Sequence, residues 1–406
     1  MQFEAYKKTM NNFKSIFKGD VYIWAIVFIL SVIGVLAVYS STGNLAFAKQ
    51  QGNTEFFLLR HLGFIVVGLF IMYVVHNIPF KFYSKVSNVL LIISIGLLFL
   101  TLTIGYNINN AQRVIPIFGF TFQPSDMAKV FLVMYIARYL SKRQEGVKDF
   151  NVFLKLLGVI ALVIVPIIPE NLSTALVVMT TSTMLMFIGR IKIKFILMLV
   201  FMGLIAAVSF YGFLKMIDMS KYTKTRLPTW ERRIDSFLGN DESGDSNYQK
   251  NQAKIAVATG GLWGKGPGNS TQRNYLPHPY SDFIFAIIVE EYGLIGGLVL
   301  IACFILLIIR ALKMVIESQR SLAALIVLGI AFSTSFQALV HMGVSVGSLP
   351  VTGLTLPLVS MGGTSILFNS IAFGIMLGIS RHIQEEKLKA STTGPGSINE
   401  DDHETA

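Results

Sequence analysis

Long apolar runs separated by short polar segments recur along the whole chain. A helix that crosses a bilayer needs about 20 mostly apolar residues, and the runs have this length. The pattern predicts an all-α integral membrane protein with ten spans, near residues 21–40, 61–78, 86–105, 125–140, 152–169, 172–188, 193–212, 283–309, 322–342 and 363–381. The predicted organisation is a cytoplasmic N-terminal segment over 1–20, a membrane domain over 21–382 and a disordered cytoplasmic tail over 383–406.

Lysine and arginine gather in alternate connecting segments. If the N-terminus is inside, every inside segment holds two or more of them, whereas the short outside segments hold only Lys49, Arg60 and Arg113. Cytoplasmic loops of membrane proteins carry an excess of these residues. Both termini are therefore predicted to be cytoplasmic.

One outside segment, residues 213–282, is much longer than the others. Within it, 247–259 is predicted to be a helix that stops at Gly260-Gly261. Long loops with structure of their own are usually functional, so this outer loop is a candidate part of the site.

Composition excludes other classes of protein. Of 406 residues, 53% are hydrophobic and 14% are charged, against about 25% charged in soluble domains. The single cysteine, Cys303, excludes a disulfide framework and a cysteine zinc site. The net charge of +11 lies between apolar runs and forms no basic stripe, so nucleic acid is not an expected partner.

Two polar clusters lie at the outer ends of spans. Asp126 and Lys129 share a helix face; they form either a helix cap with an ion pair, or a cation held ready for an anionic substrate. Ser281 and Asp282 either cap the eighth span, or present a carboxylate that acts as a general base. Glu290 lies about 12 Å further along that helix if it starts at Asp282.

Two uncharged or glycine-rich segments complete the pattern. Residues 260–270 are rich in glycine but do not match a phosphate-binding P-loop, although their backbone could approach a phosphate or a sugar. Residues 343–363 contain no Lys, Arg, Asp or Glu. They could form a re-entrant segment if protein covers their backbone.

Taken together, several motifs resemble the SEDS family (shape, elongation, division and sporulation), whose members polymerise the glycan strands of peptidoglycan. The resemblance covers roughly residues 20–382, and two segments look more like the division branch than the elongation branch. The motifs are Phe122-Gln123-Pro124-Ser125, Leu172-Ser173-Thr174-Ala175, Tyr248-Gln249 with 260–268, Leu276-Pro277, 281–286 with Glu290-Glu291, and Leu356-Pro357-Leu358-Val359-Ser360 with Gly362-Gly363.

The resemblance implies that Asp282 is the essential acidic residue, and that Asp126 and Lys129 face the same outer cavity. The family usually has Glu where this chain has Asp126, and often an aromatic residue where it has Val114. The expected activity is polymerisation of lipid II into glycan strands at the septum. Asp282 would be catalytic, and the substrate contacts would be Lys129, Asp126, Arg113, Ser281, Glu290 and Arg233.

The resemblance also implies a divalent cation, Mg²⁺ or Mn²⁺, as a cofactor. Expected partners are lipid II, the nascent glycan, a class B penicillin-binding transpeptidase, other division proteins and membrane lipids, in the bacterial cytoplasmic membrane. Three alternatives stay open: a lipid II flippase, an elongation-branch polymerase and a passive division scaffold. A flippase often shows repeat symmetry, and the sequence has no internal repeat.

Overall fold

A computed structural model describes residues 18–108, 111–117, 120–143, 149–216, 226–239 and 244–392. Over these residues the chain is a bundle of long helices. The elements are α2 (Val21–Ser41), α3 (Gly43–Gln50), α4 (Thr54–His76), α5 (Phe80–Ile104), β1 (Tyr106–Ile108), β2 (Ala111–Ile117), β3 (Phe120–Phe122), α6 (Pro124–Ser141), α7 (Phe150–Glu170), α8 (Leu172–Ile188), α9 (Ile193–Met216), α10 (Leu227–Leu238), α11 (Asp245–Gly260), η2 (Gln272–Asn274), α12 (Ile284–Glu317), α13 (Ser321–Ser345) and α14 (Thr364–Thr392).

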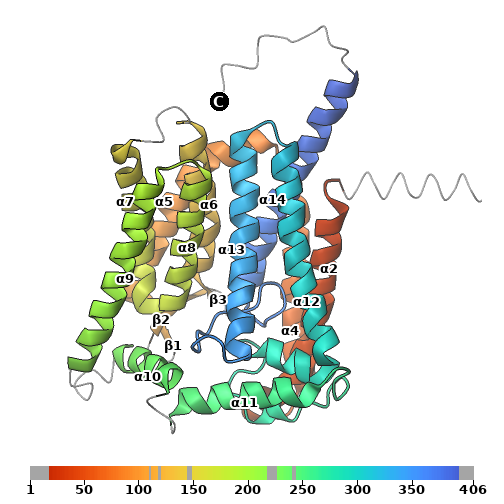
Figure 1. The fold of residues 1–406 in the computed structure, drawn as a ribbon. Helices are drawn as coiled ribbons and strands as arrows, with labels where there is room; N and C mark the ends of the chain where they lie inside the picture. The colour runs from red at the N-terminus through yellow and green to blue at the C-terminus, as the bar shows by residue number, and fades with distance from the viewer. Residues whose placement is uncertain are drawn as a thin grey trace, which may run out of the picture.

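All ten predicted spans are helices, which confirms the predicted fold class. Eight of them are long and apolar enough to cross a membrane. The other two are α6, which carries Asp126, Lys129 and Arg138, and α8, which has 17 residues. The start of α2 and the end of α14 lie at the same end of the bundle, and α10 and α11 lie at the other (Figure 1). A chain that crosses an even number of times has this arrangement.

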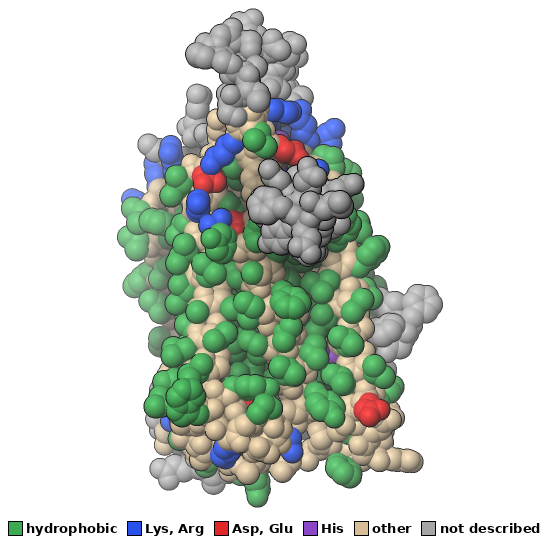
Figure 2. Space-filling model, turned by 90° about the vertical axis from the view of Figure 1, so that its right-hand side faces the viewer, with side chains coloured by type: hydrophobic (Ala, Val, Ile, Leu, Met, Phe, Trp, Pro, Cys, Tyr) green, Lys and Arg blue, Asp and Glu red, His purple; other side chains and the backbone are tan. Residues whose placement is uncertain are grey.

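Helices α4 and α14 pack closely because glycines face the contact. A side chain at Gly374 would come within 2.9 Å of the Met72 carbonyl oxygen, and one at Gly378 within 3.2 Å of the His76 carbonyl oxygen, both on α4. Small residues at such contacts let membrane helices approach, where burial of apolar surface gives little driving force. Figure 2 shows the outside of the bundle as a broad hydrophobic band, with most charged side chains of that face above it.

Helix α12 is broken at Gly293, which has φ 71° and ψ −171°. Residues 284–291 before the break are all buried, and this segment lies across the lower end of the bundle (Figure 1). The long lipid-facing stretch begins after the break. The predicted span over 283–309 is therefore not one continuous helix, and the helix does not start at Asp282, as the spacing of about 12 Å to Glu290 assumed.

Three other segments differ from expectation or extend it. The predicted helix over 247–259 is confirmed as α11, whereas α10 and the three-stranded sheet β1-β2-β3 were not predicted. The predicted disordered tail begins at residue 383, but α14 continues to Thr392 and Arg320 pairs with Glu386 at 3.0 Å. Residues 1–17 and 393–406 lie outside the described residues.

Candidate functional site

The segment between α13 and α14, residues 346–363, has no helix or strand, and other elements hold its backbone. The Gln337 side chain donates to the Thr355 carbonyl at 2.8 Å, and His341 Nδ1 lies 2.7 Å from the Leu354 carbonyl. Ser360 donates to the Ser281 carbonyl at 2.7 Å. Protein therefore covers this backbone, which is the condition for a re-entrant segment. That residues 346–363 enter the membrane stays a prediction, and we call them the re-entrant segment for short.

Asp282 faces this re-entrant segment. Gly353 has φ +70°, and a Cβ atom there would lie 3.5 Å from Asp282 Oδ2. The Asp282 side chain is only partly buried. Among the described residues its carboxylate accepts no hydrogen bond and forms no ion pair. The group is held in place by its backbone while its oxygens stay available.

Ser281 and Asp282 do not form the helix cap that was one alternative. Helix α12 begins at Ile284, its N-cap is Phe283, and no side-chain cap bond is present there. The Asp282 amide instead donates to the His278 carbonyl at 3.1 Å, and Ser281 Oγ lies 3.5 Å from the same oxygen. The capping interpretation is wrong because the chain makes a further turn before the helix starts.

Asp126 and Lys129 form an ion pair at 2.8 Å on α6. Lys129 also donates to Gln337 at 2.8 Å, and Gln337 donates in turn to Thr355 of the re-entrant segment. A hollow between α6, α13 and α14 lies next to this chain of contacts. Its lining combines these three side chains with Ser333, Thr334, Ser365, Asn369 and apolar residues.

The lining of this hollow does not include Asp282. The re-entrant segment links the two places instead, because Gly353 faces Asp282 and Thr355 binds Gln337. Residues 353–355 thus join Asp282 to this hollow, and that Asp126, Lys129 and Asp282 face one outer cavity stays a prediction.

Of the two arginines predicted to contact substrate, the structure describes the side chain of one, Arg233. Arg233 on α10 donates to the Thr352 carbonyl at 3.3 Å, so it adjoins Gly353 and Asp282. Arg113 lies on β2, and its side chain is outside the described part of the chain. Arg233 is thus a cation at the edge of the Asp282 site.

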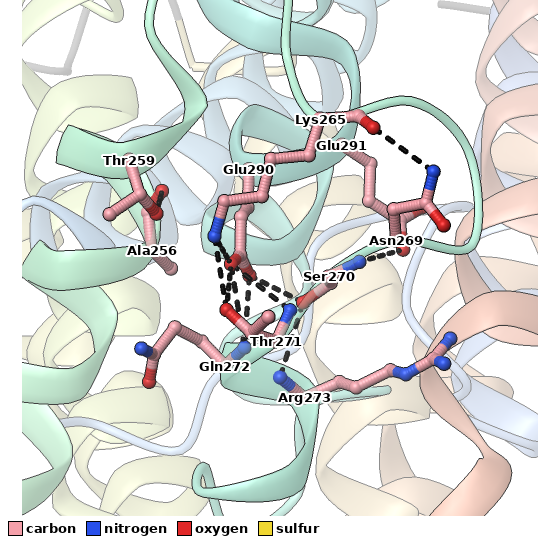
Figure 3. A network of polar contacts seen from close by, with 10 residues as sticks. All are labelled: Ala256, Thr259, Lys265, Asn269, Ser270, Thr271, Gln272, Arg273, Glu290 and Glu291. Carbon is pink, nitrogen blue, oxygen red and sulfur yellow. Dashed lines mark hydrogen bonds and ion pairs between the residues drawn. The ribbon is translucent and has the colours of Figure 1, made fainter.

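Glu290 is not placed to contact a substrate directly. Its side chain is fully buried, and Lys265 pairs with it at 2.5 Å. Thr271 donates to it from its hydroxyl at 2.8 Å and from its amide at 3.1 Å, and Ser270 and the Gln272 amide donate as well (Figure 3). Both oxygens are occupied by the outer loop, so the contacts of Glu290 are structural.

The neighbouring carboxylate, Glu291, joins the outer loop to α2. It accepts hydrogen bonds from the Ser40 hydroxyl and, at 3.3 Å, from the Ser270 amide. Arg273 donates to the Ser40 carbonyl at 2.9 Å. The pairing of Lys265 with Glu290 was not predicted. The available signal was one cation inside a glycine-rich segment and two adjacent acids in an apolar helix.

Tyr280 adds a neutral donor beside Asp282. Burial raises the pKa of Tyr280, and the nearby Asp282 carboxylate raises it further. Its hydroxyl lies 3.1 Å from His278 Nδ1. No group of three or more His, Cys, Asp or Glu side chains that could hold a metal ion is present in the described ranges.

The chain matches known proteins over most of its length. A family model described as "Cell cycle protein" (FtsW/RodA/SpoVE) matches residues 20–385. A probable peptidoglycan glycosyltransferase FtsW from Pseudomonas fluorescens is 32% identical, with 88% of each chain covered. The stage V sporulation protein E of Bacillus subtilis is also 32% identical, with 89% of this chain and 97% of that protein covered.

Solved structures share the fold. A chain from a peptidoglycan synthase complex that coordinates polymerization and crosslinking has a TM-score of 0.71 and 22% identity, and the match covers 90% of this chain and 98% of that one. The rod shape determining protein RodA of Thermus thermophilus has a TM-score of 0.63 and 23% identity, with 89% and 97% covered. The family match and the relatives confirm the resemblance seen in the motifs: this chain belongs to the SEDS family of cell cycle proteins, with FtsW, RodA and SpoVE.

Proposed function

We propose that this protein is a peptidoglycan glycosyltransferase that polymerises lipid II into glycan strands for the division septum. The observation that carries the proposal is the carboxylate of Asp282, partly exposed and without a hydrogen bond or ion pair among the described residues. A general base needs a carboxylate of this kind within reach of the proton that it removes. Relatives named peptidoglycan glycosyltransferases support the substrate.

In the proposed reaction, Asp282 takes the proton from a sugar hydroxyl of the incoming lipid-linked unit. The freed oxygen forms a bond to the anomeric carbon of the growing strand as the bond from that carbon to the polyprenyl diphosphate breaks. Negative charge then develops on the departing diphosphate. Two cations are proposed to stabilise that charge. One is Arg233, which lies beside Thr352, and the other is Lys129, which lines the hollow.

A divalent cation fits this site only if it is shared with the substrate. Mg²⁺ is commonly held by one or two carboxylates together with substrate phosphates, and the described residues contain no ligand cluster of their own. Asp282 is the carboxylate that could contribute to such a site. A bound cation would supply positive charge for the diphosphate.

Proposed partners follow from the product. Uncrosslinked glycan strands need a transpeptidase, and one structural neighbour belongs to a complex of polymerisation and crosslinking. We propose a class B penicillin-binding transpeptidase as the partner, at the septum. The division branch is preferred over the elongation branch because most of the similar curated proteins carry the FtsW name.

The test is glycan synthesis by the purified protein in detergent with lipid II as the substrate. Asp282→Asn should remain folded and lose activity by about 100-fold or more, whereas Asp245→Asn, on the exposed first turn of α11, should keep it. Normal polymerisation by Asp282→Asn would remove the general base. If the wild-type protein makes no polymer in detergent but moves lipid II across vesicles, the flippase alternative is correct.

A further inference from the structure

The break in α12 leaves backbone groups that the helix itself cannot satisfy. A helix end has carbonyl or amide groups without partners in the helix, and such groups are costly when they are away from water. At Gly293 one helical segment ends and another begins, so both kinds of group meet there. Residues 260–266, which we call the glycine segment, lie directly against this break.

The glycine segment supplies the missing partners. The amides of Lys265 and Gly266 each donate at 2.9 Å, to the carbonyls of Glu290 and Glu291. On the other side of the break, the Leu294 amide donates to Gly261 at 2.9 Å and the Ile295 amide to Leu262 at 3.5 Å. The segment therefore completes α12 with its own backbone.

This contact is backbone against backbone, which explains the glycines. Gly264 has φ +79° and Gly293 has φ +71°, in the left-handed region that favours glycine. A Cβ atom at Gly264 would collide with the Glu291 carbonyl, and one at Gly293 with the Leu262 carbonyl. The amides of Lys265 and Gly266 are thus used by α12 and cannot donate to a phosphate at the same time.

One ion pair holds the glycine segment in this position. Glu290 is fully buried, and Lys265 is the cation that pairs with it. Loss of one partner leaves a buried charge uncompensated, which is strongly destabilising for the local arrangement. Lys265 also donates to Thr271 at 3.0 Å, so it joins both ends of the outer-loop turn to α12.

The buried first segment of α12 connects this ion pair to the catalytic group. Asp282 precedes the helix start at Ile284 by two residues, and Glu290 lies near the other end of the same segment. Gly260 packs so closely on this segment that a side chain there would collide with the Val289 carbonyl. A shift at Glu290 would therefore move the segment that carries Asp282.

We infer that Lys265 is a positioning residue for Asp282, acting through Glu290 and the glycine segment. The inference rests on the proposed function, because it assigns Lys265 to the same reaction without contact with the substrate. A displacement of about 1 Å at a reacting group can reduce a rate by about 100-fold. Lys265 would thus affect the rate constant and leave substrate binding nearly unchanged.

The experiment compares Lys265→Met, Lys265→Arg and a control, Lys250→Met, in the full-length protein in detergent. Lys250 lies on α11 and contacts the ring of Phe237. Hydrogen exchange is measured over peptides 260–274, together with kcat and KM for lipid II. Lys265→Met should speed exchange and lower kcat by roughly tenfold to 100-fold, with KM within about twofold. Lys265→Arg should restore most of both, and Lys250→Met should change neither.

Three results would overturn the inference: faster exchange with unchanged kcat, lower kcat with unchanged exchange, or a loss that appears mainly in KM. The last would make Lys265 a substrate contact. If Lys265→Met fails to fold, Lys265→Gln is measured in its place, because its amide can still donate to Glu290. Absence of polymer from the wild-type protein would instead count against the proposed function, and the exchange data would still report whether Lys265 holds the glycine segment.

Discussion

Helix α9 and the first segment of α12, residues 284–292, are both apolar and were both predicted to lie in membrane spans, yet they are held in different ways. Only 11% of the most apolar window of α9 is buried within the protein. In contrast, residues 284–291 are buried without exception. The first segment of α12 also carries Glu290 and Glu291, whereas the last charged residue of α9, Lys215, lies at its end and pairs with Asp235 on α10 at 2.7 Å.

The difference follows from what hydrocarbon can and cannot solvate. Lipid accepts apolar side chains as well as protein does, but it satisfies no backbone hydrogen bond. A regular helix such as α9 satisfies its own backbone and can stand almost alone in lipid. A broken helix cannot, so the first segment of α12 requires the glycine segment, the ion pair and the cover of α11.

The largest effect on folding should come from a methyl group at the break. Gly293→Ala places a Cβ atom where the Leu262 carbonyl lies, at a φ of 71°. We expect a loss of at least about 3 kcal/mol in the free energy of unfolding. Thermal unfolding in detergent, followed by tryptophan fluorescence, measures it.

The matched control is Gly203→Ala on α9, where a Cβ atom meets nothing within 4 Å. This variant should keep or slightly raise the melting temperature, because alanine favours helix more than glycine. Equal behaviour of the two variants would contradict the view that only the α12 segment depends on close backbone packing.

The sequence predicts the regular helix α9 well and the broken helix α12 poorly. Residues 193–212 read as a span and form one, because a long apolar run is sufficient information for a helix in lipid. The break at Gly293 was missed because Leu294, Ile295 and the residues after them are as apolar as any span. Gly293 can be read in the sequence, but its positive φ is stabilised by contacts of the break with Gly261 and Leu262, about thirty residues earlier. No local sequence pattern shows those contacts.

The candidate site shows the same division. The ion pair of Asp126 and Lys129 could be predicted, because it needs only a spacing of three on one helix. The two further contacts, from Lys129 to Gln337 and from Glu290 to Lys265, join residues more than twenty positions apart. Glu290 was therefore predicted to contact the substrate. In the structure its carboxylate binds Lys265, Ser270 and Thr271 of the outer loop.

A smaller effect should follow from removing the link between the hollow and the re-entrant segment. Gln337→Leu leaves the Thr355 carbonyl without its donor and Lys129 without its second acceptor. We expect glycan synthesis to fall by roughly tenfold, and unfolding free energy by about 1–3 kcal/mol. Ser335 lies on the same helix as Gln337, and Ser335→Ala removes a buried hydrogen bond to the Phe304 carbonyl on α12. This variant should reduce stability alone. A Gln337→Leu variant with a normal rate would show that the hollow acts independently of Asp282.

The smallest effect should come from the lipid-facing surface of α9. Leu204 is 61% exposed and Leu300, on α12, is 0% exposed. Leu300→Ala leaves a cavity and should cost about 2–5 kcal/mol. Position 204 faces lipid with either leucine or alanine, so no cavity forms inside the protein. The free energy of unfolding should therefore change by no more than about 0.5 kcal/mol. The two melting temperatures, measured in the same detergent, test this directly. A large loss for Leu204→Ala would mean that a protein surface, such as another copy of the chain, covers α9, and the contrast between a helix solvated by lipid and a segment held by protein would then no longer hold.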